Sequence, residues 1–303
     1  MSDLADGSAG PATRDRARGI ALVLTGVVSV QFGAAVAATL FPLIGPAATV
    51  GLRLSIAAVL LVAVGGFRVR DRPPVELALA AGLGLSMAGM VLSLYEAIER
   101  MPLGVVITIE FLGPLAVAIV LSRRWSDVLL AALAASGVAV LTGGLGGAEV
   151  GGVLFALGAA AGWACYIAFN RSLGRRRVNG ALPLAAVVAA LAVAPWALVQ
   201  PGRALLEPRV LLLGLVVAVL SSVVPHSADM RALRWVPARL FGVMMSLHPA
   251  VAAIAGFIVL GQTLEWNEWA GMALVVAASA GAAWTTRRLA EPPAEVAADG
   301  LNA

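Results

Sequence analysis

Long apolar runs of about 20 residues, separated by short charged segments, dominate this chain. A helix rises about 1.5 Å per residue, so such a run crosses the roughly 30 Å hydrocarbon core of a bilayer. Of the 303 residues 60% are hydrophobic and only 13% charged, whereas about a quarter of a soluble domain is charged. We predict an all-α polytopic membrane protein with ten transmembrane helices, at residues 20–42, 46–66, 75–95, 102–121, 126–144, 149–171, 180–199, 209–229, 237–260 and 265–286.

The 21 basic residues are all arginines, and their placement predicts the orientation. With the N-terminus in the cytoplasm, seventeen lie on the cytoplasmic side, three on the outer side and one, Arg53, within a span. Positive charge collects on the cytoplasmic side of membrane proteins. We therefore expect both termini to be cytoplasmic. Because the arginines form no continuous basic stripe, nucleic acid is not expected as a partner.

The spans fall into two groups of five, with a polar tail at each end. Residues 1–19 are predicted to form a cytoplasmic polar N-terminal tail. Residues 287–303, rich in Ala, Pro and Glu, are predicted to form a disordered cytoplasmic C-terminal tail. Between the tails we expect a first five-helix repeat at 20–144 and a second at 149–286.

The two groups resemble each other in sequence. Pro102 and Pro114 recur as Pro237 and Pro249, in both cases 135 residues later. Because five is an odd number, the second repeat must be inverted relative to the first. Inverted repeats are typical of secondary transporters with alternating access, although duplication in a purely structural membrane protein is the alternative. The four prolines are predicted to interrupt backbone hydrogen bonding and so to line a cavity.

Two charged residues lie inside spans, where a charge is costly and therefore indicates function. Arg53 and Glu110 lie at similar depths, about 10 and 12 Å from the outer side. They could form a structural ion pair, or they could bind the carboxylate and the ammonium of an amino acid. The two arrangements could also be successive states. If the substrate ammonium and a proton compete for Glu110, the site performs proton antiport.

Further polar and aromatic residues lie in other spans. Trp163 and Tyr166 share a helical face, which suggests either an aromatic box for an ammonium group or an interfacial belt. Gln31 lies near the midplane, where it could contact substrate or bond a neighbouring helix. These three residues are candidates for the binding site.

The two histidines are the remaining candidates. His226 and Asp229 are three residues apart, which fits a proton relay at an inner gate or an ordinary interhelical hydrogen bond. His248 lies in the middle of the ninth span and is a candidate for substrate binding or coupling. Two histidines and one aspartate make a thin ligand set, so neither a metal nor a cofactor is expected.

Several segments carry a family resemblance. SVQFGAAVAATLFPLIGPAATVGLRL (29–54), PLGVVITIEFLGPLAVAI (102–119), GWACYIAFNRSLG (162–174) and residues 220–265 resemble the threonine/homoserine exporter family, in the EamA branch of the drug/metabolite transporter superfamily. The resemblance implies two EamA-like repeats in the bacterial inner membrane and export of small amino acids driven by the proton gradient. It also reveals departures, because His248 and Gln262 stand where the family has acids, and Asp229 replaces a glutamate. Either His248 takes over a titrating role or coupling rests on Glu110 alone.

The expected partners are a small amino acid, protons and the lipid bilayer, with the chain acting as a monomer or homodimer. A drug or metabolite efflux carrier on the same scaffold is the alternative function. A membrane-embedded enzyme is a remote alternative, because the loops offer arginine clusters but no HExxH-like motif.

Overall fold

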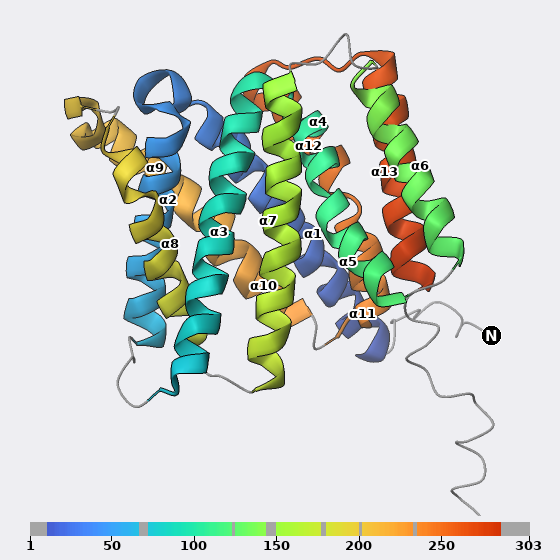
Figure 1. The fold of residues 1–303 in the computed structure, drawn as a ribbon, viewed down its shortest axis with the longest axis horizontal. Coiled ribbons are helices and arrows are strands. Elements are labelled where there is room, and N and C mark those ends of the chain that lie inside the picture. Colours follow the sequence, from blue (N-terminus) through green and yellow to red (C-terminus); the bar gives the residue numbers. More distant parts are fainter. Residues whose placement is uncertain are drawn as a thin grey trace, which may run out of the picture.

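A computed structural model describes residues 11–66, 72–122, 125–143, 150–176, 180–199, 202–232 and 235–285. Over these residues all regular structure is helical and no strand occurs, which confirms the predicted all-α class (Figure 1). The helices are α1 (Pro11–Ala38), α2 (Phe41–Gly65), α3 (Pro74–Arg100), α4 (Leu103–Glu110), α5 (Leu112–Ser122), α6 (Trp125–Leu141), α7 (Val150–Arg175), α8 (Ala181–Ala197), α9 (Pro208–Ala218), α10 (Val224–Ala232), α11 (Ala238–Met245), α12 (His248–Leu260) and α13 (Trp266–Thr285), with a 3₁₀ turn η1 (Gly202–Leu206) and a π-helical turn η2 (Val219–Val223).

Six helical stretches in the described part of the chain are long and apolar enough to cross a membrane: Ala17–Ala38, Phe41–Val64, Pro74–Arg100, Leu103–Val120, Val150–Arg175 and Val243–Leu260. Three shorter apolar stretches accompany them: Val128–Leu141, Ala181–Ala197 and Pro208–Val223. Large apolar side chains also face outward, among them Val120 and Leu129, which are 72% and 73% exposed. Such exposure suits contact with lipid rather than with water. The chain is a multi-pass membrane protein.

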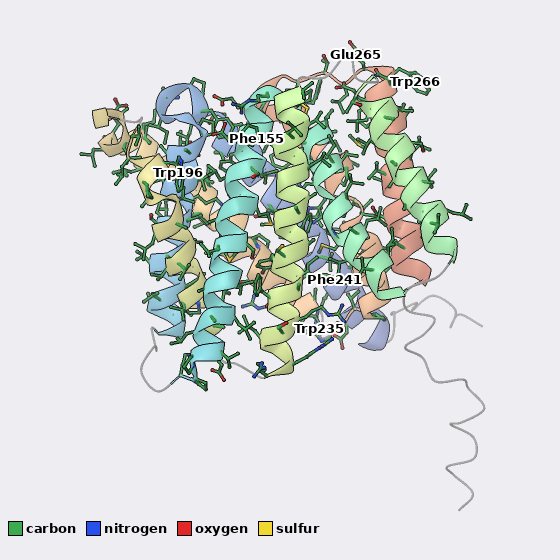
Figure 2. All side chains as sticks on the ribbon, viewed as in Figure 1. Phe155, Trp196, Trp235, Phe241, Glu265 and Trp266 are labelled. Carbon is green, nitrogen blue, oxygen red and sulfur yellow. The ribbon has the colours of Figure 1, made fainter. Side chains whose placement is uncertain are left out.

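Aromatic side chains lie toward both ends of the bundle (Figure 2). Phe155, Trp196 and Trp266 lie in its upper part, and Trp235 and Phe241 lie in its lower part. Phe155 and all three tryptophans, Trp196, Trp235 and Trp266, are exposed. Tryptophan concentrates where the hydrocarbon meets the lipid headgroups. The aromatic side chains therefore mark the two interfaces of a membrane around the bundle.

Helices of the first half of the chain pack mainly against helices of the second half. The helix α1 contacts η2, α10 and α12, whereas α7 contacts α3, α4 and α5. At one side of the bundle α6 lies beside α13, and at the other side α2 lies beside α8 (Figure 1). The largest cluster of buried apolar residues contains members from both halves. Neither half thus has a separate core.

The backbones of α6 and α13 approach closely at a pair of glycines. A Cβ atom on Gly137 would lie 2.9 Å from the carbonyl oxygen of Gly271, and one on Gly271 would lie 2.5 Å from that of Gly137. Neither position can carry a side chain unless the helices move apart. Small residues at such crossings let membrane helices gain van der Waals contact.

Several helix bounds differ from the sequence-based expectation. The helix α1 begins at Pro11 rather than at residue 20, so helix continues into the predicted N-terminal tail. The helix α2 begins at Phe41, but Gly45 is non-helical with φ 78° and Pro46 follows it, which explains why the apolar pattern predicted a start at 46. The predicted C-terminal tail, 287–303, lies outside the described residues, as do residues 1–10.

Candidate functional site

Two membrane-crossing segments are broken at matching places. The helix α4 ends at Glu110 and α5 begins at Leu112, while α11 ends at Met245 and α12 begins at His248. Pro114 and Pro249 come directly after the breaks. Since proline has no N–H, the carbonyls four residues earlier, those of Glu110 and Met245, lack their usual helical hydrogen bond. Each break therefore leaves one backbone carbonyl of an apolar segment without its usual helical donor.

The other two candidate prolines start helices instead of interrupting them. Pro102 precedes α4 with ψ 139°, and Pro237 precedes α11 with ψ 136°. A proline is well tolerated at the start of a helix, where its missing N–H would have no intrahelical partner. The four prolines thus delimit two short helices, α4 and α11, of eight residues each.

Arg53 projects from α2 and is held by uncharged groups. Its Nη1 donates to the Tyr95 hydroxyl at 3.0 Å, and its Nη2 donates to the Ser221 carbonyl at 3.3 Å. The guanidinium carbon also lies 5.6 Å from the centre of the Tyr95 ring, which is itself fully buried against Phe41. The Ser221 carbonyl belongs to the π-helical turn η2, and such turns are frequent at functional sites.

Glu110 is buried at the end of α4, and Arg53 is the cation that acts on it electrostatically. The two groups are not in contact: among the described residues, no cationic nitrogen lies within 4.0 Å of the Glu110 carboxylate. Of the two arrangements expected from the sequence, the closed ion pair is therefore not the one present here. The pair is open, with Arg53 turned toward Tyr95 and Ser221.

Four side chains, three from helices and one from the break between α4 and α5, form a connected group. The Nε2 of Gln31 on α1 lies 2.8 Å from the Nδ1 of His248 on α12. The His248 ring lies 5.6 Å from the ring of Phe111, and Trp163 of α7 meets Phe111 edge-on at 5.1 Å. The structure thus brings together three residues selected from the sequence, Gln31, His248 and Trp163. They meet around Phe111, which follows Glu110 in the chain and which the sequence did not single out.

Unpartnered polar atoms concentrate in this region. Among the described residues, four buried side-chain nitrogen or oxygen atoms have no hydrogen-bond partner. Three belong here, namely Arg53 Nε, Ser221 Oγ and His248 Nε2, and the fourth is Ser279 Oγ on α13. Buried polar groups are nearly always paired in folded proteins, so a cluster of unpaired ones calls for a ligand. We name Arg53, Glu110, Tyr95, Ser221, Gln31, His248, Phe111 and Trp163 the central polar group.

The remaining candidate residues lie outside the central polar group, or their side chains lie outside the described residues. Tyr166 packs in a separate cluster with Leu83 and Leu173 on α3 and α7, apart from Trp163. The side chains of His226 and Asp229 lie outside the described residues, although their backbone belongs to α10. In the described part of the chain no three His, Cys, Asp or Glu residues are placed to hold a metal ion.

Three members of the central polar group were not predicted: Tyr95, Phe111 and Ser221. Weak signals existed for two of them, because Tyr95 is one of only two tyrosines and Phe111 follows Glu110 directly. Nothing in the sequence distinguishes Ser221 from other serines of the apolar runs. Its importance comes from the backbone of η2, which the residue pattern did not predict.

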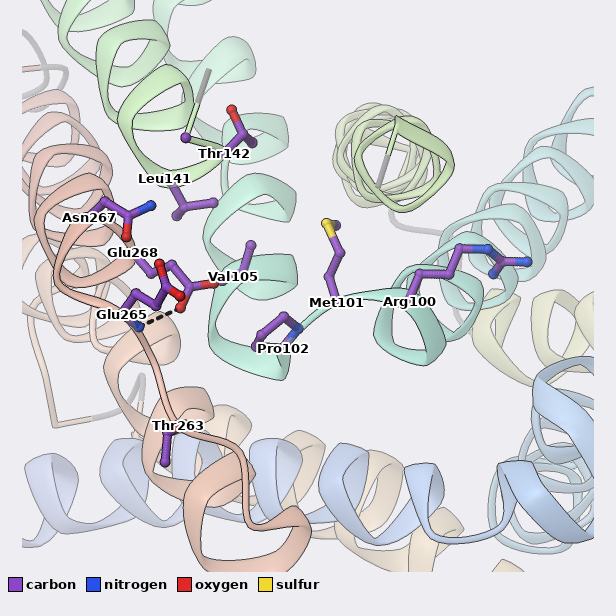
Figure 3. Close-up of a pocket in the computed structure, with 11 residues that line it drawn as sticks. Arg100, Met101, Pro102, Val105, Leu141, Thr142, Thr263, Glu265, Asn267 and Glu268 are labelled. Carbon is purple, nitrogen blue, oxygen red and sulfur yellow. Dashed lines mark hydrogen bonds between the residues drawn. The ribbon is translucent and has the colours of Figure 1, made fainter. Parts of the chain in front are cut away.

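A cavity of about 410 Å³ is lined by residues that do not belong to the central polar group (Figure 3). Its walls come from the junction of α3 with α4, the end of α6 and the start of α13, and include Arg100, Pro102, Thr142, Glu265 and Glu268. Two of its charges are already engaged, because Arg100 pairs with Glu96 at 2.8 Å and the Glu268 carboxylate accepts the Glu265 N–H at 2.7 Å. At its edge, Gln262 Oε1 accepts the N–H of Leu103, the first residue of α4.

The chain is similar to known transporters. A model of the EamA-like transporter family matches residues 150–284. The threonine/homoserine exporter RhtA of Salmonella typhimurium (strain SL1344) is 38% identical over 273 residues, which are 89% of this chain and 92% of the exporter. RhtA of Escherichia coli (strain K12) is 37% identical over the same shares.

A solved crystal structure shares the fold, with a TM-score of 0.59 and 20% identity over 89% of this chain and 99% of that one. The similarity to the RhtA proteins extends over 89% of the chain. These relatives are exporters, and the matched family is one of transporters rather than enzymes. The chain belongs to the EamA-like transporter family and, within it, to the threonine/homoserine exporters.

Proposed function

We propose that this protein exports small amino acids of the threonine and homoserine type across the bacterial inner membrane, in exchange for protons. The observation that carries the proposal is the open pair of Arg53 and Glu110, a half-buried guanidinium and a buried carboxyl group that are not in contact. A zwitterion offers one charge for each of them. The names of the relatives, which are threonine/homoserine exporters, support the same class of substrate.

Arg53 suits the substrate carboxylate. Guanidinium has five N–H donors in a planar fork, and its Nε is buried without an acceptor in the described structure. An arriving carboxylate can take this donor and a second one from the same fork, which gives a strong bidentate contact. Tyr95 and Ser221 hold the guanidinium until then, so the empty site does not collapse into an ion pair.

Glu110 suits the substrate ammonium and also the coupling proton. A carboxylate that binds an ammonium cannot bind a proton at the same time without losing that contact. Substrate leaving toward the outside frees Glu110 for a proton, and release of the proton inside frees it for the next substrate. This competition is the logic of antiport.

Alternating access would use two inverted halves, 20–144 and 149–286. Reciprocal packing supports this, because α1 contacts η2, α10 and α12 as α7 contacts α3, α4 and α5. The short helices support it too: Leu103–Glu110 and Ala238–Met245 correspond at both ends with the 135-residue offset of the prolines. The family model matches 150–284, which coincides with the proposed second half. All members of the central polar group come from one chain, so a monomer suffices for binding.

The test is transport by the purified protein in liposomes. Labelled threonine and homoserine are expected to accumulate against their gradients when a pH gradient is imposed. In Glu110→Gln, loss of a charge-assisted contact to the ammonium should lower the rate about tenfold to hundredfold and remove its dependence on the pH gradient. Glu99→Gln is the matched control, because Glu99 is an exposed carboxylate that lies outside the central polar group.

Two results would contradict the proposal. If Glu110→Gln retained the pH dependence of the wild-type protein, Glu110 would not be the coupling group. If the wild-type protein moved neither amino acid but carried an aromatic or drug-like compound, the substrate class would be wrong and the chain would be a different efflux carrier.

A further inference from the structure

His248 carries a hydrogen-bond donor whose position and identity are set by its neighbour. The Gln31 amide nitrogen lies 2.8 Å from His248 Nδ1. An amide nitrogen only donates, so Nδ1 is the acceptor of this bond. A neutral imidazole with an accepting Nδ1 carries its single proton on Nε2. The ring therefore presents an Nε2–H.

That Nε2–H is buried and has no partner in the described structure. The ring cannot readily turn to find one. Gln31 bonds the Nδ1 edge of the His248 ring. The centre of the Phe111 ring lies 5.6 Å from the centre of the His248 ring, with an angle of 38° between the two ring planes. Phe111 is in turn braced by the edge contact with Trp163. Burying an unmade hydrogen bond costs stability, so an oriented and unpaired donor indicates a ligand that supplies the acceptor.

The polar groups of the site then specify what a ligand must contain. Arg53 Nε and His248 Nε2 are both unpaired donors, whereas Glu110 in its charged form only accepts. An α-amino acid brings a carboxylate for Arg53 and an ammonium for Glu110, which leaves the His248 donor unmatched. A side-chain hydroxyl oxygen is an acceptor that matches the His248 donor, and a purely aliphatic side chain has none.

We infer that His248 Nε2–H binds the side-chain hydroxyl of the substrate, and that Gln31 is a positioning residue that keeps this donor in place. The inference rests on the proposed function and makes it narrower: the site selects hydroxy amino acids over isosteres without the hydroxyl. A pocket built to bond a hydroxyl rejects an analogue that lacks it, because the buried donor then stays unpaired. Threonine should be preferred to valine, and homoserine to norvaline.

The experiment measures the transport rate against concentration for these four amino acids in proteoliposomes. His248→Phe keeps a ring beside Phe111 but removes the donor, and it should lower transport of threonine about tenfold or more while leaving valine unchanged or improved. Gln31→Leu should shift the threonine-to-valine ratio in the same direction. His248→Gln retains a donor near the position of Nε2 and should restore much of the preference. Thr25→Val is the control on the Gln31 helix, since that exposed hydroxyl bonds only its own helix at Ala21.

The outcomes separate the two proposals. Wild-type protein that transports neither threonine nor homoserine would overturn the proposed function itself. Wild-type transport of threonine with equal losses for threonine and valine in His248→Phe, or with no recovery in a folded His248→Gln protein, would overturn only the role of His248. Thermal unfolding of each variant in detergent identifies the folded ones.

Discussion

Arg53 keeps a charge inside the bundle with the help of two neutral acceptors, and this arrangement distinguishes arginine from lysine. Arg53→Lys retains the charge, but a single ammonium cannot bond Tyr95 and Ser221 while also gripping a carboxylate in two places. The KM for threonine should rise about tenfold to hundredfold, the cost of one or two charge-assisted hydrogen bonds.

The measurement is the concentration dependence of threonine transport in proteoliposomes. Arg72→Lys provides the control, because Arg72 lies at the start of α3 and forms an ion pair with Glu76 at 3.7 Å. An unchanged KM in Arg53→Lys would mean that the fork geometry of Arg53 plays no part in binding.

Part of the central polar group could be predicted because charged and amide side chains are rare within apolar runs. Arg53, Glu110, Gln31 and His248 can be found in that way. Glu110 and His248 lie at the two helix breaks, and Gln31 bonds His248. Tyr95, Phe111 and Ser221 could not be found, since aromatic residues and serines are ordinary in membrane helices and only the fold brings them together. Helical spacing predicts that Tyr166 and Trp163 share a face of α7. Residues three apart still differ in direction by about 60° around the helix axis, and this difference is enough for Tyr166 to pack in another cluster.

The start of α4 depends on a side chain from the other half of the chain. Gln262 accepts the Leu103 N–H at 2.9 Å, a donor that has no partner within its own helix. Gln262→Leu should therefore lower the free energy of unfolding by about 0.5–2 kcal/mol, as the loss of a helix cap does. Gln262→Glu should raise it by about 0.3–1 kcal/mol, because a carboxylate at a helix N-terminus is favoured by the helix dipole.

Unfolding in detergent, followed by circular dichroism, measures both changes. Asn267 is the matched control, since its amide makes only a long contact of 3.5 Å with the Val140 carbonyl at the same end of the bundle. Equal effects of Gln262→Leu and Asn267→Leu would argue against a specific cap.

At the scale of elements, hydropathy predicted where helices occur better than where they break. Each apolar run coincides with helix, and the Pro102 and Pro237 positions predicted the starts of α4 and α11. The interruptions at Phe111 and at Ser246–Leu247 keep dihedral angles of the right-handed helical region, so they leave little trace in residue preference. The turn η2 has no signature in the sequence, since a π-helical turn needs no special residue.

The whole molecule has a direction across the membrane that labelling can test. The start of α3 and the end of α7 lie at the lower end of the bundle, and the start of α13 lies at the upper end (Figure 1). After Cys165→Ser, which removes the only cysteine, single cysteines are introduced as Val75→Cys, Arg175→Cys and Glu265→Cys. An impermeant maleimide should label position 265 from outside intact cells and positions 75 and 175 only after the membrane is opened.

Labelling of positions 75 and 175 on different sides of the membrane would contradict both the fold and the inverted repeats. Labelling of both from outside would reverse the orientation but keep the fold. At this scale the all-α, multi-pass class could be predicted from the sequence, because apolar length acts over the whole chain and does not depend on individual contacts, whereas the orientation stays a prediction.

The π-helical turn coincides with a difference of one residue between the two proposed halves. From Pro74, which opens α3, to Pro102 there are 28 residues, whereas from Pro208, which opens α9, to Pro237 there are 29. One surplus residue is what a single π-helical turn takes up. A duplicated ancestor that gained this residue in its second copy would have acquired, in the same event, the outward-turned Ser221 carbonyl on which Arg53 rests. Departure from symmetry would then be the origin of a charged site in an otherwise duplicated scaffold.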